Sequence, residues 1–266
     1  MNVINEFIKF LTDRGVSYGL AVAYLVVSAL IVIMAVVYVI MWLLVLVRYL
    51  KTNRMTCSGG KTSCEVAKEV LAASGLGHIK VMRANFFRAW FFGNCYSITK
   101  KTIFLRRNIY DRNSLTAVGL ALQKVGVAKM CEGNVKMAKA RNYMQIVGIF
   151  GPFLFIPIIL IGGLIDIFLF QSIGTFSIAS IIIGLVILLA GFVVTFLNIP
   201  VEKKANNMAL EMLESTGVCN AEERKQIKKV LNTYIIAYIC DFILTILRIA
   251  QIVLEIVINS QINKNN

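Results

Sequence analysis

The sequence predicts an α+β membrane protein in which four transmembrane helices anchor a small cytoplasmic domain built from two loops. Three observations lead to this prediction. Hydrophobic residues make up 58% of the 266 residues and the mean hydropathy is +0.75, whereas soluble domains are nearer half apolar. Four apolar stretches are long enough to cross about 30 Å of hydrocarbon. Most charged residues lie in the loops that separate these stretches.

The membrane segments follow one another from the N-terminus. Residues 1–17 have apolar positions at helical spacing, which predicts an external amphipathic helix at the membrane interface or, alternatively, an extension of the first span. The first span covers residues 18–47, which contain no charged residue and form a stretch too long for the apolar region of a signal peptide. Further spans are predicted at 143–170, 176–198 and 233–259.

The two loops that build the domain differ in charge. The loop at 48–142 holds 18 Lys and Arg against four acids, and this difference, 18 − 4, equals the net charge of +14 of the whole chain. The loop at 199–232 holds six basic and five acidic residues. Because positively charged loops stay inside, both are expected in the cytoplasm, with the termini and the QSIGT loop at 171–175 outside. This topology describes a multi-pass protein integral to the plasma membrane.

Within the loops, the pattern of residues predicts an α+β arrangement. A helix is expected at 63–77, with Ser63 as its cap and a glycine at its end. Alternating, β-branched and aromatic residues at 78–86 and 97–107 predict two strands. A helix is expected from Asn113 or Ser114 through Met130. The second loop adds a helix at 201–216, which ends before Gly217.

The cysteines predict no metal site. There are six: Cys57, Cys64, Cys95, Cys131, Cys219 and Cys240. Under the predicted topology five are cytoplasmic and one lies in a span, so all are expected to be reduced thiols. Cys57 and Cys64 are seven residues apart, which matches no common zinc-binding motif.

Three longer stretches identify a family. They are RMTCSGGKTSCEVAKEVLAASGLG at 54–77, NIYDRNSLTAVGLALQKVGVAKM at 108–130 and NIPVEKKANNMALEMLESTG at 198–217. With the order of spans and loops, they resemble the YugP-like family of membrane zinc metallopeptidases over roughly residues 54–248. The resemblance implies a gluzincin-like peptidase domain, in which two His of an H-E-x-x-H helix and a Glu of a later helix bind zinc.

The residues at the motif positions depart from this pattern. Aligned through Gly126, the two ligand histidines fall on Gln123 and Val127, and the catalytic Glu falls on Lys124. The presumed third ligand is retained as Glu202. Because one carboxylate cannot hold a catalytic zinc with three protein ligands, we expect zinc to be lost and no cofactor to replace it.

Loss of the motif predicts a pseudo-peptidase, which is not an enzyme and acts by binding. The chain has one histidine, His78, so no Ser–His or Cys–His pair can replace the metal chemistry. A scaffold or regulator of an active peptidase relative is the preferred role, and a peptide ligand is expected to add to the strand around Ile103. Two alternatives are a metallopeptidase with non-standard ligands and a basic, membrane-anchored binder of lipid or nucleic acid.

For the basic loop, membrane lipids are the preferred partner, an acidic protein or peptide is next, and nucleic acid is the weakest. The stretch at 86–107 interleaves aromatic residues with Arg and Lys, as a stacking surface for nucleic acid does. The same aromatic residues are equally suited to the domain core or to the bilayer surface. Anionic headgroups attract each nearby cation by roughly 1 kcal/mol, which favours the lipid interpretation.

Two sets of buried charges need partners. In the fourth span Asp241, Arg248 and Glu255 share one helix stripe, and we expect this stripe to face other helices, with Asp166 of the second span as the mate of Arg248. An ion or proton path is the alternative.

The other buried charge is Glu202, whose carboxylate requires a cation once the metal is gone. We expect Lys124, or failing it Gln123, to contact Glu202. In the alternative, Lys124 faces solvent and Glu202 pairs with Lys203 or Lys204.

Overall fold

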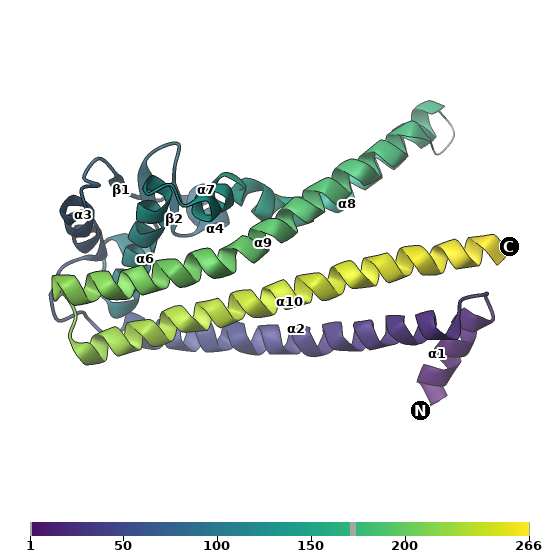
Figure 1. The fold of residues 1–266 in the computed structure, drawn as a ribbon, viewed down its shortest axis with the longest axis horizontal. Coiled ribbons are helices and arrows are strands. Elements are labelled where there is room, and N and C mark those ends of the chain that lie inside the picture. Colours follow the sequence, from purple (N-terminus) through teal and green to yellow (C-terminus); the bar gives the residue numbers. More distant parts are fainter. Residues whose placement is uncertain (1, 171–173, 266) are drawn as a thin grey trace. The chain divides into compact units, whose positions relative to one another are not determined.

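A computed structural model describes residues 2–170 and 174–265 (Figure 1). The chain divides into two compact units, one made of Met1–Leu43 with Ile239–Asn266 and the other of Leu44–Tyr238. Both units are mostly helical, and the described residues contain one small sheet. The mixed helix and sheet composition predicted from the sequence is confirmed at this level.

Among the residues that the structure describes, three helices are long and apolar enough to cross a membrane. They are α2 (Tyr18–Asn53), the segment Phe153–Phe170 and α9 (Thr175–Thr216). Phe153–Phe170 comprises most of α8 (Gln145–Ile165) and the π-helix η1 (Asp166–Phe170). The expected fourth span lies within α10 (Ala221–Asn265), which is not among these three. The external QSIGT loop was predicted at 171–175, of which 171–173 lie outside the described residues.

The first unit contains the N-terminal helix that the apolar spacing predicts. Helix α1 (Asn2–Thr12) is separated from α2 by a turn in which Gly15 has φ of 84°, so α1 is not an extension of the span. Leu11 and Val16 form a buried cluster with Ala21 and Ile258 of the same unit.

The second unit contains a three-stranded sheet in the order β1-β3-β2. Strand β1 (Lys80–Arg83) pairs parallel with β3 (Thr102–Leu105), and β2 (Cys95–Ser97) pairs antiparallel with β3. The sequence predicted two strands, at 78–86 and 97–107, and the second contains β3 but only the last residue of β2. A turn interrupts that stretch, and Lys101 adopts φ of 45° there, outside the strand region.

Short helices surround the sheet in the second unit: α3 (Ser63–Ala73), α4 (Phe86–Phe92), α5 (Arg107–Tyr110), α6 (Leu115–Glu132) and α7 (Lys136–Tyr143). The cap of α3 is Thr62 rather than Ser63, because Thr62 forms a reciprocal capping box with Glu65. Helix α6 begins after its cap Ser114, one of the two predicted caps.

Helix α6 lies at the centre of the second unit and is buried over nearly its whole length. Two glycines allow close packing: a Cβ at Gly126 would lie 2.9 Å from the carbonyl oxygen of Ala205 on α9. At Gly119 it would meet the side chain of Ile227 on α10. This packing brings the candidate motif helix against α9.

Helix α9 is continuous where the sequence predicted a span and a separate loop helix. Pro200 lies inside it and removes one backbone hydrogen bond, which normally favours a break. The residues after Pro200 are held by tertiary packing, since Val201 and Ala205 belong to the buried core with α6. Figure 1 shows α9 running beside α8 and then beside α6, within the same unit.

Candidate functional site

The candidate site lies where α6 crosses α9. Gln123, Lys124 and Val127 of α6 are buried, and Glu202 of α9 is fully buried. A lysine and a glutamate are almost never fully buried unless they are paired, so their partners decide what the site can do.

Glu202 forms ion pairs with two cations. The Lys124 ammonium donates to both carboxylate oxygens, at 2.9 and 3.1 Å. The Arg141 guanidinium donates to Oε1 at 2.8 Å from the last turn of α7, and its Nε donates to Asn198 of α9 at 2.8 Å. The contact predicted between Lys124 and Glu202 is confirmed, and Arg141 is a partner that the sequence did not predict.

These cations determine the protonation state of the carboxyl group. Burial alone would raise the pKa of Glu202, but the charges of Lys124 and Arg141 outweigh it and lower the pKa below its ordinary value. Glu202 is therefore an anion at neutral pH, held between two cations in a nearly dry environment.

Gln123 belongs to a neighbouring hydrogen-bond pair and does not serve as the partner of Glu202. Its Nε2 donates to Oδ1 of Asn206 at 2.6 Å, and Asn206 donates to the carbonyl of Leu231 at 3.2 Å. Asn198, Glu202 and Asn206 follow one another at four-residue spacing on α9, so they share one helix face. This stripe of polar residues on one face of α9 is the sequence signal that could have identified both asparagines.

Comparison with known proteins identifies the family. A family described as "Putative neutral zinc metallopeptidase" matches residues 25–257. The chain belongs to this zinc metallopeptidase family. It is also 21% identical over 204 residues to the "Putative membrane protease YugP" of Bacillus subtilis (strain 168), covering 77% of this chain and 84% of the relative. No solved structure matches it.

The residues that the sequence analysis assigned to the motif positions do not fit a zinc ion in this arrangement. A metal at Glu202 would have to displace the Lys124 ammonium and the Arg141 guanidinium from the carboxylate oxygens. The amide of Gln123 is bonded to Asn206, and Val127 has no lone pair. As these side chains are bonded, the α6–α9 crossing presents no open position for a metal.

A second group of residues offers metal-ligand atoms. Three potential ligand atoms lie within 4.8 Å of one another, one each from Cys57, Cys219 and Glu223. Cys57 and Cys219 are joined as a disulfide in the structure, with their Cα atoms 5.7 Å apart. The Glu223 carboxylate accepts hydrogen bonds from Ser58, at 3.0 and 2.7 Å, and from the backbone of Asn220 at 2.8 Å.

Two expectations about this region are wrong. The expectation that the chain has no cofactor is overturned by the family match, which implies zinc, and by the Cys57, Cys219 and Glu223 group. The expectation that every cysteine is a free thiol fails for Cys57 and Cys219, which are 162 residues apart and meet only through the fold. The other four cysteines are free and buried.

The predicted peptide-binding strand is also wrong. Ile103 lies in β3, the central strand, which pairs with β1 on one side and β2 on the other. Because both edges of β3 are already hydrogen-bonded, a peptide cannot add to it.

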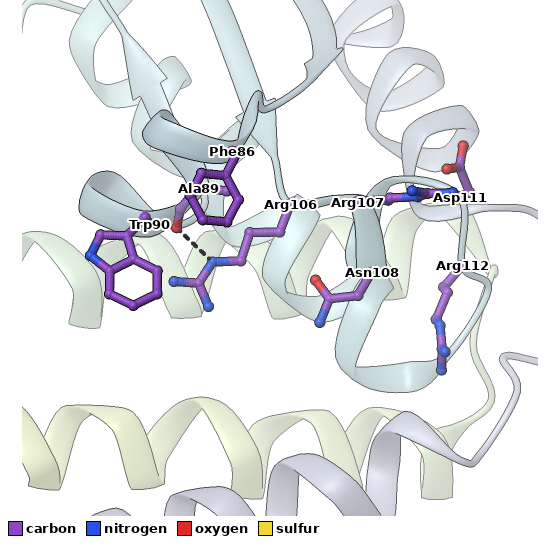
Figure 2. A pocket seen from close by; sticks show the side chains of 8 residues that line it. All are labelled: Phe86, Ala89, Trp90, Arg106, Arg107, Asn108, Asp111 and Arg112. Carbon is purple, nitrogen blue, oxygen red and sulfur yellow. Dashed lines mark hydrogen bonds between the residues drawn. The ribbon is translucent and has the colours of Figure 1, made fainter.

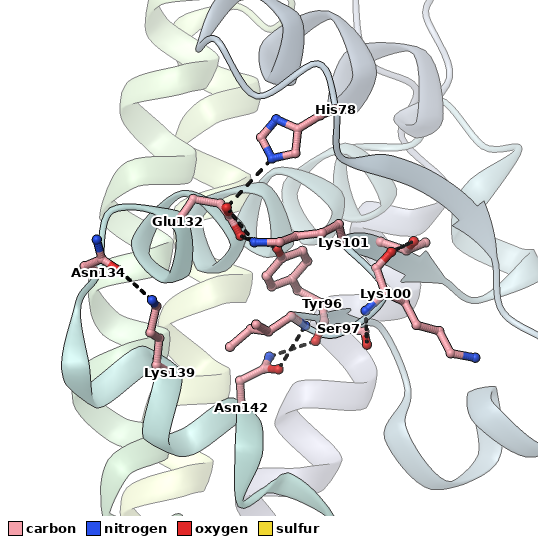
Figure 3. Close-up of polar contacts among 11 residues, drawn as sticks. His78, Tyr96, Ser97, Lys100, Lys101, Glu132, Asn134, Lys139 and Asn142 are labelled. Atoms are coloured by element: carbon pink, nitrogen blue, oxygen red, sulfur yellow. Dashed lines mark hydrogen bonds and ion pairs between the residues drawn. The ribbon is translucent and has the colours of Figure 1, made fainter.

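The single histidine belongs to a surface cluster around Glu132 (Figure 3). The Glu132 carboxylate accepts hydrogen bonds from the Lys101 ammonium at 2.5 Å and from the Tyr96 hydroxyl at 2.7 Å. The Nε2 atom of His78 lies 3.7 Å from the same carboxylate. Burial and the neighbouring Glu132 raise the pKa of Tyr96, so its hydroxyl stays protonated. The cluster joins the end of α6 to β2 and to the turn before β3.

The Asp166 carboxylate, predicted to pair with Arg248, accepts backbone hydrogen bonds. Its partners are the N–H groups of Gly174 at 2.8 Å, Phe176 at 3.3 Å and Ser177 at 2.7 Å, at the start of α9. A carboxylate there satisfies free amides and complements the helix dipole. Arg248 belongs to the other unit, so the pair stays a prediction.

Proposed function

We propose that this chain is a membrane-anchored member of the zinc metallopeptidase family that does not hydrolyse peptides at the α6–α9 crossing and acts by binding. The ion pairs of Glu202 carry this proposal. Hydrolysis at a family site needs a metal-bound water and a carboxylate base beside it. Here the base position is occupied by Lys124, a cation whose ammonium lies 2.9 Å from the Glu202 carboxylate.

In this proposal the ion pairs stabilise the domain as a metal cross-link would. Lys124 and Arg141 come from the loop at 48–142 and Glu202 from the loop at 199–232, so their contacts join the two loops. The domain that remains is suited to act as a scaffold or regulator of an active family member in the same membrane.

The proposed topology has four spans, with 233–259 as the last, and both loops on the cytoplasmic side of the plasma membrane. The excess of 18 basic over four acidic residues in the first loop supports this orientation. It also makes membrane lipids the first partner to consider.

Peptide cleavage by the purified full-length protein in nanodiscs, with zinc added, tests the proposal. We expect the wild-type protein to cleave a fluorogenic peptide library no faster than the Glu202→Gln variant does. Lys203→Gln is the matched control, because Lys203 is exposed on the same helix. If the wild-type protein and Lys203→Gln both cleave peptides and Glu202→Gln does not, the site is an active one and the proposal is wrong.

A second candidate function is a metallopeptidase that uses non-standard ligands, which the Cys57, Cys219 and Glu223 group favours. Opening the disulfide would provide two thiolates and a carboxylate, three of the four ligands of a tetrahedral zinc. In this case the reduced protein binds one zinc per chain and cleaves peptides, and both properties are lost in Cys219→Ser but kept in Cys64→Ser. Zinc binding that survives in Cys219→Ser rejects this candidate.

A further inference from the structure

Helix α4 presents large aromatic side chains outward. Phe86, Phe87 and Trp90 are 73%, 72% and 71% exposed, and none of the seven residues of α4 is buried. The helix is nevertheless well formed, because the Asn85 side chain caps its first turn. An aromatic patch of this kind marks an interaction site or a membrane contact.

A cavity of about 920 Å³ lies beside α4 and is rich in arginine. Its lining residues are Phe86, Ala89, Trp90, Arg106, Arg107, Asn108, Asp111 and Arg112 (Figure 2). The Arg106 Nε donates to the Ala89 carbonyl at 3.1 Å, which holds its guanidinium next to the aromatic rings. Three arginines against one aspartate give the cavity an excess of positive charge.

None of the three arginines has a carboxylate partner among the residues that the structure describes. Within residues 2–170 and 174–265, Arg107 and Arg112 form no ion pair, and both are exposed. The aspartate of the cavity, Asp111, lies 3.9 Å from Arg83 instead. The cavity therefore offers guanidinium groups that are available to an external anion.

Contacts within the second unit link the elements on both sides of this cavity to residues at the ends of two apolar stretches. The Phe91 ring of α4 lies 5.1 Å from that of Phe150, three residues before the apolar window Phe153–Phe170. On the other wall, the Asn108 side chain donates to the Tyr49 hydroxyl at 3.0 Å, just after the uncharged stretch of α2. Both sides of the cavity are thus joined to the ends of candidate membrane spans.

We propose that α4 lies in the interfacial layer of the bilayer and that the adjoining cavity binds the headgroup phosphate of an anionic phospholipid through Arg106, Arg107 and Arg112. Aromatic side chains concentrate at this depth, where the ring is apolar and its surroundings are partly hydrated. Guanidinium groups bind phosphate oxygens in a bidentate manner. A lipid satisfies both features at once, because its acyl chains contact the aromatic rings while its phosphate enters the cavity.

The depth of α4 is measurable because the chain contains two tryptophans, Trp42 and Trp90. Trp42→Phe leaves Trp90 as the single tryptophan, whose fluorescence is excited selectively. In nanodiscs whose lipids are brominated near the headgroup, we expect strong quenching of Trp90 and protection from aqueous iodide. Unquenched, iodide-accessible Trp90 would place α4 in water and overturn the proposal.

Headgroup binding is tested by lipid retention during purification, measured by mass spectrometry from membranes with equal phosphatidylglycerol and phosphatidylcholine. We expect preferential retention of phosphatidylglycerol, weakened about 30-fold in Arg107→Gln/Arg112→Gln. This variant spares the Arg106 bond to Ala89. Lys203→Gln/Lys204→Gln removes the same charge from exposed positions of α9 and should retain the lipid.

Three outcomes contradict the proposal. Equal retention of both lipids shows that no charged headgroup is selected. An equal loss in the lysine variant shows that general charge attraction, and not the cavity, is responsible. Full displacement of phosphatidylglycerol by millimolar inorganic phosphate assigns the cavity to free phosphate instead of lipid.

Discussion

Glu202 is a fully buried carboxylate with two cationic partners, Lys124 and Arg141. Desolvation of a buried pair can exceed its attraction, so the arrangement stabilises the fold chiefly when every charge is paired. Its asymmetry matters, because removing one of the two cations leaves the carboxylate paired, whereas removing the carboxylate leaves two buried cations.

Substitution of these residues should follow that asymmetry. We expect Glu202→Gln to destabilise the domain by about 3–5 kcal/mol and Lys124→Ala by less, because Arg141 still contacts the carboxylate after the second change. Lys124→Met combined with Glu202→Gln should recover part of the loss, since it removes one stranded cation. Thermal unfolding in detergent measures the stability of each variant. Equal unfolding midpoints for Glu202→Gln and Lys124→Ala would contradict the predicted order.

The same carboxylate predicts a dependence of stability on pH. The pKa of Glu202 is lower in the folded state than its ordinary value of 4.5, so its contribution to stability is complete above about pH 4.5 and falls as the pH drops through the folded pKa. Comparing acid unfolding of the wild type with Glu202→Gln isolates this contribution. The free energy of unfolding of the variant should change less with pH below pH 4.5 than that of the wild type. If the two proteins lose stability equally below pH 4.5, the linkage is disproved.

Among the elements, the crossing of α6 and α9 determines the geometry of the site. Gly126 allows α9 to approach α6 closely, next to the residues that contact Glu202 and Asn206. The backbone atoms of Ala205 line this contact, and they cannot move aside as a flexible side chain can.

Adding one methyl group at this crossing should therefore be harmful. Gly126→Ala places a Cβ 2.9 Å from the Ala205 carbonyl oxygen, and we expect a loss of about 1–3 kcal/mol despite the higher helix propensity of alanine. Gly163→Ala on α8 is the control, because no atom lies within 4 Å of its added Cβ. A thermal midpoint for Gly126→Ala at or above that of the control would refute the packing argument.

At the scale of the whole molecule, charge is distributed so that the excess of cations lies in one loop. The 18 basic residues of the loop at 48–142 outnumber its four acids, while the three membrane-crossing candidates are apolar. This distribution predicts the side of the membrane on which the domain lies.

Labelling of single cysteines tests this topology on a cysteine-free background. A cysteine at position 100 should react only after the cells are permeabilised, whereas one at position 175 should react with an impermeant maleimide from outside. A cysteine in α1, for example at position 6, should behave like position 175. Labelling of position 100 in intact cells would invert the proposed orientation.

The sequence by itself determined the features that depend on residues close together in the chain. Uncharged runs identified apolar helices, the charge difference identified the basic loop, and three local stretches identified the family before any comparison. The sequence also predicted that Gln123, Lys124 and Val127 stand at the motif positions, and this assignment stays a prediction. The pairing of Lys124 with Glu202 also followed, because a buried carboxylate without a metal requires a cation.

Only the tertiary structure decided which distant segments meet. Arg141 approaches Glu202 across 61 residues and Cys57 approaches Cys219 across 162, and no local pattern encodes either distance. Strand β3 is central because β1, which precedes α4 in the sequence, pairs with it in parallel. Composition and periodicity describe which face of a segment can be buried. The neighbours of that segment depend on how all segments pack together, and no single stretch of sequence contains this information.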